Sequence, residues 1–371
     1  MSTRRTRSQR YEERVKAAER LALRCGCVVW CLLLAGCSPA YVLRAGYEEA
    51  RILWRRQPIE QLLRSENLDA ATRSKLELVL AVRLFARDAL GLRVDGSYAS
   101  LARVDADQVV HVVTAAYRLR LESYTWWFPI VGRVPYKGYF SKPDAEAEAA
   151  ELEKEGYDTS VRPSVAFSTI GWFADPLLSN LLRYDRATLA EVIIHELLHN
   201  TTYVGGHAEF DESFANFVGH RGAMQFFATH GDEVAREEAA SAWNETLRFS
   251  AFLGDFTARL RAAYAAGATL ADRQQLFTAA QEEFRRLPDR PDAYRDFAAE
   301  PLNNAVILHY LAYADRLQLF ESLSQQQGGD LAHTIQRVVQ AVHRDNSDPF
   351  AALEAMVGAQ RAYAGRRRWL F

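Results

Sequence analysis

One stretch constrains the fold of this chain most: residues 185–202, which read DRATLAEVIIHELLHNTT. The stretch contains no Pro or Gly and begins with Asp185, a favoured N-cap residue, so we expect one uninterrupted helix. His195 and His199 are four residues apart and therefore share one helix face. The residues around them are apolar, so most of this helix should be buried. Two histidines and an acid in such a helix need a strong compensating partner, and a divalent cation would be one.

The residues His195, Glu196 and His199 form the H-E-x-x-H pattern of zinc metallopeptidases. In this interpretation each histidine offers a ring nitrogen to one Zn²⁺ ion. Glu196 lies at the edge of the same face, where it can reach a water on the cation without binding the cation itself. We therefore predict Glu196 to be the catalytic general base. The alternative is a pair of core histidines that are satisfied by hydrogen bonds and bind no metal.

A catalytic zinc site has three protein ligands and one open position, so a third ligand is needed. We expect Glu212, which lies thirteen residues after His199 and opens a helix predicted over residues 210–227. The Gly205-Gly206 pair between them lets the chain double back. His207 is the rival and would give a three-histidine site, and two weaker candidates are Asp211 and His220. The expected cofactor is one Zn²⁺ ion per chain.

The first 36 residues are predicted to be a signal peptide. Residues 1–24 hold eight basic and three acidic side chains, and the apolar run 25–36 is too short to span a bilayer. The boundary Leu34-Ala35-Gly36-Cys37 resembles the bacterial lipobox. That resemblance implies cleavage before Cys37 and acylation of its thiol and new amine, which gives a stable lipid anchor. Ser38 implies the outer membrane, facing the periplasm; a single-pass anchor or an ordinary signal peptide remain the alternatives.

Composition narrows the class of the remaining 335 residues. The whole chain has a net charge of −2 and residues 1–24 contribute +5, so the rest carries −7. That balance gives no basic stripe for nucleic acid. All four cysteines lie at or before Cys37, so no disulfide framework and no cysteine ligand is expected.

Periodicity predicts an α+β fold, mostly α, with a small mixed β-sheet lobe over residues 37–205 and a helical lobe over 206–371. The site is expected between the two lobes. In the first lobe we expect helices at 43–56, 65–90 and 143–155, and strands at 108–116, 114–125, 157–161 and 164–170. In the second we expect helices at 210–227, 232–266, 270–286, 303–324, 331–344 and 349–365. The aromatic, Pro- and Gly-rich stretch 123–140 suits a sharply turning strand at a cleft wall.

A family resemblance rests on the lipobox together with four longer segments: FPIVGRVPYKGYF at 128–140, STIGWFADPLL at 168–178, the HELLH helix and FDESFA at 210–215. Together they resemble a family of bacterial predicted zinc aminopeptidases, lipoproteins of the gluzincin kind. The resemblance implies a zincin-like fold, a peptide substrate and Glu212 as the ligand from a "glutamate helix". Asn216 stands where thermolysin-like enzymes have an Asp, which implies a weaker hydrogen bond to a ligating histidine.

The leading functional prediction is zinc-dependent peptide hydrolysis, with aminopeptidase activity implied by the resemblance alone. A donor for the transition-state oxyanion cannot be ranked from sequence among Tyr203, His207, Tyr136 and Tyr310. The strand at 164–170 could pair with an extended peptide. One alternative is an envelope endopeptidase; another is a non-catalytic lipoprotein that serves as a scaffold or binding module.

Overall fold

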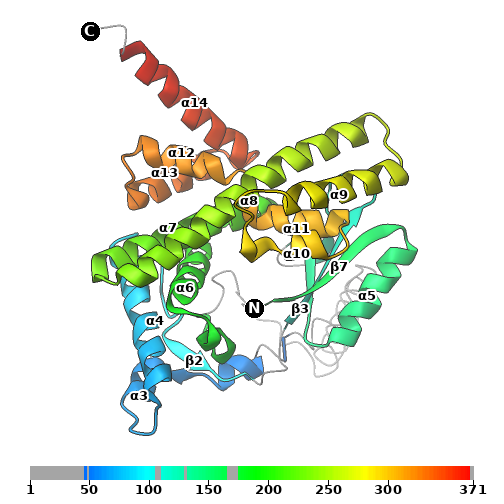
Figure 1. Ribbon diagram of the computed structural model, residues 1–371. Helices are drawn as coiled ribbons and strands as arrows, with labels where there is room; N and C mark the ends of the chain where they lie inside the picture. Colours follow the sequence, from blue (N-terminus) through cyan, green and yellow to red (C-terminus); the bar gives the residue numbers. More distant parts are fainter. Residues whose placement is uncertain (1–45, 48–49, 105–109, 129–131, 165–173, 368–371) are drawn as a thin grey trace, which may run out of the picture.

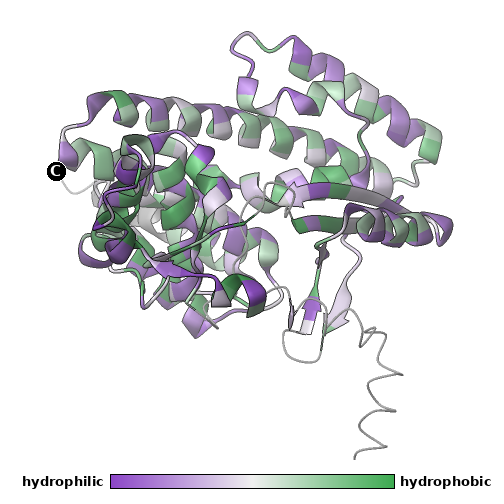
Figure 2. Cartoon of the chain, turned by 90° about the horizontal axis from the view of Figure 1, so that it is seen from below, coloured by the Kyte–Doolittle hydropathy of each residue, from purple (hydrophilic) through white to green (hydrophobic). Residues whose placement is uncertain are grey.

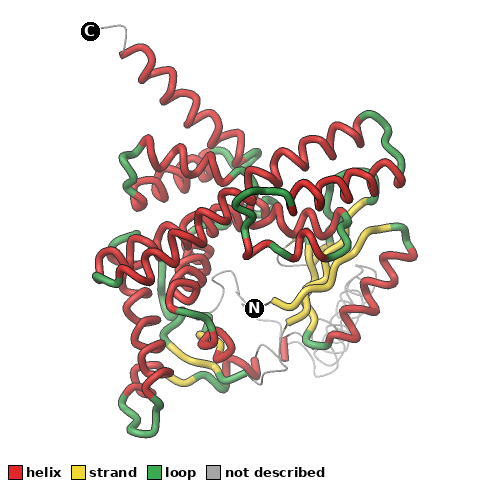
Figure 3. Tube along the Cα trace, viewed as in Figure 1, coloured by secondary structure: helices red, strands yellow, loops and turns green. Residues whose placement is uncertain are grey.

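The computed structural model describes residues 46–47, 50–104, 110–128, 132–164 and 174–367 of the chain. Helices make up most of this part, and the strands form small sheets (Figure 3). The predicted class, α+β and mostly α, is confirmed. The signal peptide, Cys37 and residues 165–170 of the last predicted strand lie outside the described residues.

The chain from residue 57 to 102 builds one side of the molecule. Helix α4 (Ala70–Asp88) begins after Asp69, whose side chain accepts a hydrogen bond from the Thr72 amide at 2.9 Å. The predicted start at residue 65 was wrong, because this cap places the first helical residue at Ala70. The short helix α3 and a three-stranded sheet precede and flank it: β1 (Gln57–Pro58), α3 (Ile59–Leu63), β2 (Ser100–Ala102) and β8 (Leu177–Leu178). These strands were not predicted, since two or three residues show no period.

A second sheet lies on the opposite side, with α5 (Lys142–Lys154) packed against it (Figure 1). Its order is β6-β3-β7, and both neighbours pair antiparallel with the central strand. The three strands are β3 (Val110–Tyr117), β6 (Tyr136–Tyr139) and β7 (Tyr157–Ser164), and the separate hairpin β4 (Trp126–Phe128) and β5 (Gly132–Val134) completes this region. Gly156 follows α5 with a φ of +94°, the left-handed conformation in which a glycine commonly ends a helix.

Two strand predictions need correction here. A strand over 114–125 was expected, but β3 ends at Tyr117, where the chain turns and the Tyr117 amide bonds the carbonyl of Glu122 at 3.2 Å. The carbonyls of this turn accept hydrogen bonds from the Asn304 side chain, a tertiary contact that sequence periodicity does not encode. The strand expected at 157–161 continues to Ser164, because β3 pairs with it along its whole length.

The rest of the described chain is helical. Its two longest helices, α7 (Ala208–His230) and α8 (Glu233–Ala265), pack against each other, and α6 (Arg186–Thr201) lies against α7 (Figure 1). The helices that follow are α9 (Leu270–Arg285), α10 (Asp296–Ala299), α11 (Asn304–Ala314), α12 (Leu317–Gln326), α13 (Leu331–Arg344) and α14 (Pro349–Arg367). The far end of α14 projects from the body.

Two helix boundaries differ from prediction. Helix α7 begins at Ala208 rather than 210 and ends at His230, where Gly231 adopts the left-handed conformation. Glu212 therefore lies in the second turn and does not open the helix. The helix predicted over 303–324 is broken into α11 and α12 at Asp315 and Arg316, and Arg316 has a φ of +49°. The break is held by the Asp315 amide, which donates to the Ser213 hydroxyl at 3.1 Å.

One large apolar core joins most of these elements, from Ile59 to Val357, so it draws on residues of both expected lobes. Fully buried phenylalanines dominate it, among them Phe210, Phe214 and Phe320. Helices α4, α12 and α13 carry apolar and polar residues on different faces, the pattern of helices packed on a core. Figure 2 shows apolar and polar residues along the helices. Within the described residues no helix is both long and apolar enough to cross a membrane.

Candidate metal centre

Helix α6 forms as its sequence predicts. The Asp185 carboxylate caps its start by accepting hydrogen bonds from the Thr188 amide at 2.7 Å and the Thr188 hydroxyl at 2.9 Å. The helix buries Ile193 and Leu197 completely in the large core. Its remaining face presents His195 and His199, each only 8% exposed. The backbone of α6 thus places both imidazoles on one side, one turn apart.

Helix α7 approaches this face closely enough for its own acid to reach the imidazoles. The closest approach is at Gly219, where an added Cβ would lie 2.9 Å from the Glu191 carbonyl oxygen and 3.2 Å from the His195 Cβ. No other residue fits that contact without moving a backbone. Because glycine lets the two helices meet here, Glu212, seven residues earlier on α7, can project over the end of α6.

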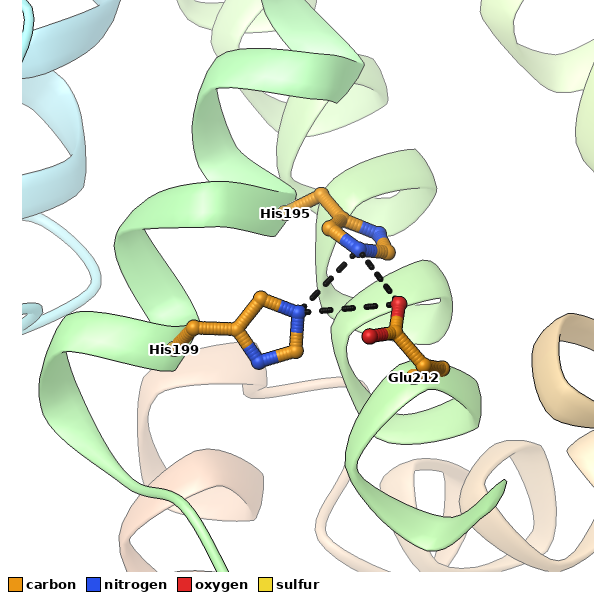
Figure 4. A group of neighbouring side chains, drawn as sticks. All are labelled: His195, His199 and Glu212. Atoms are coloured by element: carbon orange, nitrogen blue, oxygen red, sulfur yellow. Dashed lines mark hydrogen bonds and ion pairs between the residues drawn. The ribbon is translucent and has the colours of Figure 1, made fainter. Parts of the chain in front are cut away.

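The three predicted ligands converge (Figure 4). His195 Nε2 lies 3.2 Å from Glu212 Oε2 and 3.3 Å from His199 Nε2, and His199 Nε2 lies 3.7 Å from Glu212 Oε2. Atoms bound about 2.0–2.1 Å from one tetrahedral zinc are about 3.3 Å apart. The donor set and its separations therefore fit a metal ion, although side-chain hydrogen bonds alone could also hold the group.

The charges of the group call for a cation or a proton. Burial alone would lower the pKa of His199, but the carboxylate of Glu212 outweighs burial and raises this pKa to about 9. Burial would likewise raise the pKa of Glu212, yet the nearby imidazole of His199 holds it far below the usual value. The group therefore favours added positive charge, which either a proton or a bound metal ion would supply.

Glu196 lies beside the three candidate ligands and is not itself one of them. Its Oε2 is buried and has no hydrogen-bond partner among the residues that the structure describes, and burial raises the pKa of the carboxyl group. A buried acceptor that nothing satisfies is costly, so such atoms point to a missing water, ion or substrate.

The rival ligands do not join the group. The His207 carbonyl accepts the amides of Phe210 and Asp211 at 2.9 and 3.0 Å, which places this residue at the start of α7. Asp211 is buried and accepts the Val204 amide at 2.9 Å, and burial raises its pKa to about 7. His220 lies farther along α7 with its ring 5.2 Å from that of Trp243.

Other predicted residues have different surroundings. The side-chain amide of Asn216 donates to the Tyr313 carbonyl at 2.7 Å, so it fastens α7 to α11. Tyr203, 39% exposed, is near enough to Asp211 and Glu212 for their charges, after burial, to raise its pKa. Tyr310 points into the aromatic core, with its ring 5.2 Å from that of Phe249.

Tyr136 approaches the group from the sheet side of the molecule. It is the first residue of β6, opposite Thr114 of β3. Burial raises its pKa most, and the charge of Glu212 is the next cause. Of the four donors proposed from sequence, Tyr136 and Tyr203 therefore lie within electrostatic reach of Glu212.

Sequence reasoning missed Tyr313 and His309, which α11 brings to the same place. The Tyr313 ring is stacked on that of His195 at 6.3 Å and 29°, and the His309 ring meets Tyr313 edge-on at 5.6 Å. The charge of Glu212 is the main cause of the raised pKa of Tyr313, and burial lowers the pKa of His309 to about 4. The available signal was their i,i+4 spacing in an otherwise apolar helix.

Comparison with known proteins gave one result. The model of a protein family described as "Putative aminopeptidase" matches residues 40–353. No curated protein and no solved structure matches the chain. The matched range includes α6, α7 and α11, and hence all the residues of the candidate centre.

Proposed function

We propose that this chain, which belongs to that aminopeptidase family, is a metal-dependent peptidase whose metal ion is held by His195, His199 and Glu212. The observation that carries the proposal is the convergence of the three side chains, whose ligand atoms all lie within 4.8 Å of one another. Family membership supports peptides as the substrate class. The expected resemblance to aminopeptidases is confirmed by the match.

Zinc is the metal that best suits two imidazoles and one carboxylate at these separations. Bound there, it would polarise the scissile carbonyl and lower the pKa of a water to about 7. Glu196 would accept the proton of the attacking water and pass it to the leaving amine. Its buried Oε2, which no described residue contacts by a hydrogen bond, supports this role, since a purely structural metal site needs no free acceptor beside it.

The family supports an aminopeptidase, which requires a free amino group on its substrate. An endopeptidase of the cell envelope is the alternative. Paired peptides that differ only in N-terminal acetylation separate the two: an aminopeptidase cleaves the free form alone, and an endopeptidase cleaves both.

We further propose that the protein is a lipoprotein anchored at Cys37 on the periplasmic face of the outer membrane. Cys37→Ala should then release it from the membrane fraction.

Glu196→Gln tests the mechanism directly. We expect a metal content equal to that of the wild type and a kcat lower by roughly 10²–10⁴-fold, because the base is lost and the ligands remain. Glu191→Gln is the matched control on the same helix and should keep wild-type activity. Full activity of Glu196→Gln would overturn the mechanism. A wild-type protein that holds metal but cleaves no peptide would favour the scaffold alternative.

A further inference from the structure

We propose that Tyr313 is a catalytic residue: its phenol donates a hydrogen bond to the scissile carbonyl oxygen as that oxygen gains negative charge. The inference rests on the function proposed above and assigns the hydrogen-bond donor for the oxyanion, which that proposal leaves open. No bond to tyrosine forms or breaks in this role. The hydroxyl keeps its proton, and the bond strengthens only as the carbonyl carbon becomes tetrahedral.

The position of Tyr313 beside the ligands is the first reason. Its ring lies along the face of His195, 6.3 Å between centroids, and yet 41% of the residue is exposed. It therefore contacts the metal group on one side and is open to an incoming substrate on the other. Glu212 belongs to the same cluster as His195, so the ring lies on the side of the group where the substrate would meet the metal ion.

The second reason is how firmly the backbone of Tyr313 is held. The Asn216 amide donates to the Tyr313 carbonyl at 2.7 Å, and the Ser213 hydroxyl donates to the Ala312 carbonyl at 3.0 Å. Ser213 and Asn216 stand one and four residues after Glu212 on α7. The same stretch of α7 thus carries Glu212 and holds the backbone from which the phenol projects. A donor contributes most to catalysis when its place is set before the charge develops.

The neighbouring tyrosines fit this role less well. Tyr310, one turn earlier on α11, has its ring 5.8 Å from that of Phe297, and the Arg162 guanidinium lies 5.4 Å above the Tyr310 ring. Tyr136 is within reach of Glu212, but its backbone belongs to β6 and is positioned by the sheet. Tyr136 is therefore the rival donor that the experiment has to distinguish.

Tyr313→Phe removes the hydroxyl and keeps the ring on His195. We expect kcat to fall roughly 10²–10³-fold, the loss typical of one oxyanion donor, with KM little changed and metal content equal to that of the wild type. Affinity for a phosphinic peptide, whose charged oxygens imitate the tetrahedral state, should fall by a similar factor. Tyr310→Phe is the matched control on the same helix and should change neither quantity.

Each other outcome overturns the assignment in a recognisable way. Wild-type kcat and phosphinate affinity in Tyr313→Phe would show that the phenol is not the donor, and a loss in Tyr136→Phe alone would identify the rival. Reduced metal content in Tyr313→Phe would mean that the hydroxyl supports the metal ligands and is not the oxyanion donor. If the wild type holds metal but neither cleaves peptides nor binds the phosphinate, the proposed function is wrong and this role falls with it.

Discussion

Two regions of this protein fix their geometry by different means. The α6–α7 pair is positioned by close packing: backbone meets side chain at Gly219, and the apolar side of α7 stacks Phe214 and Phe217 on Phe320 at 5.4 and 5.6 Å. Among the described residues, the β6-β3-β7 sheet with α5 and β4 has an apolar cluster of six buried residues. It depends instead on hydrogen bonds to two acids, Glu148 and Asp158.

Glu148 of α5 shows how the polar region is joined. Its carboxylate accepts hydrogen bonds from the Trp126 indole at 2.9 Å, the Lys137 ammonium at 3.0 Å and the Tyr139 hydroxyl at 2.7 Å. It thereby links the helix to β4 and β6. Such bonds are directional but tolerate small displacements, whereas interlocked side chains do not.

Asp158 joins the sheet to the helical body in the same way. Its carboxylate accepts from the Arg273 guanidinium of α9 at 2.5 Å and from the Asn304 amide at 3.0 Å. The difference between the regions teaches where precision is needed. Ligand atoms must meet within tenths of an ångström, so packing fixes them, and the sheet that brings Tyr136 can be held more loosely.

The largest loss of stability should come from breaking the ion pair between Asp158 and Arg273. Asp158→Asn leaves Arg273, whose side chain is 11% exposed, without its charged partner, and we expect a loss of about 3–5 kcal/mol in the free energy of unfolding. Urea denaturation measures it. Glu151→Gln, which breaks an exposed ion pair with Lys154, is the control and should leave the midpoint unchanged. Equal stability of both variants would remove the distinction between the regions.

The α6–α7 pair should be sensitive to changes in side-chain volume rather than to changes in charge. Gly219→Ala forces its methyl group against the Glu191 carbonyl and the His195 Cβ, which we expect to cost about 1–3 kcal/mol and to weaken zinc binding by moving Glu212. Zinc titration into the apoprotein and thermal unfolding measure the two effects. Gly254→Ala on α8 meets nothing within 4 Å and should stabilise by about 0.5–1 kcal/mol. Unchanged zinc affinity in Gly219→Ala would contradict the packing argument.

The smallest effect concerns pH. Burial would raise the pKa of Glu148, but the hydrogen bonds from Tyr139, Trp126 and Lys137 outweigh burial and lower it below 4.5. A lowered pKa in the folded state gives stability that is present above pH 4.5 and is lost as the pH falls through the folded value. The wild type should therefore lose more stability on acidification from pH 6 than Glu148→Gln does. Parallel curves for the two proteins would show that the acid contributes no such stability.

The parts of the site that sequence could predict are those with local causes. Asp185 as a cap and His195 and His199 at i,i+4 depend on one helix alone, and Glu212 follows from a short loop that ends in glycines. Tyr313 could not be placed this way, since its backbone is held by hydrogen bonds from Asn216 to its own carbonyl and from Ser213 to the Ala312 carbonyl, 97 and 99 residues apart in sequence.

The same distinction applies to the fold: elements with local causes were predicted, and those that depend on tertiary contacts were not. Long periodic helices such as α8 and α13 were predicted to within one residue at each end. The break between α11 and α12 was missed, because it depends on the Asp315 amide meeting the hydroxyl of a distant helix. The short strands β1, β2 and β8 were missed because their pairing, and not their composition, makes them strands.

The hydroxyl of Ser213 donates to Ala312 and accepts from Asp315, so both of its bonding capacities are used. Few amino acids offer a donor and an acceptor on so short a side chain. Any variant designed for a different specificity therefore has to retain Ser213, although this residue is fully buried and faces no substrate. Side chains around the opening can be replaced, but Ser213 has to be kept, because it links the helix that carries Glu212 to the helix that carries Tyr313.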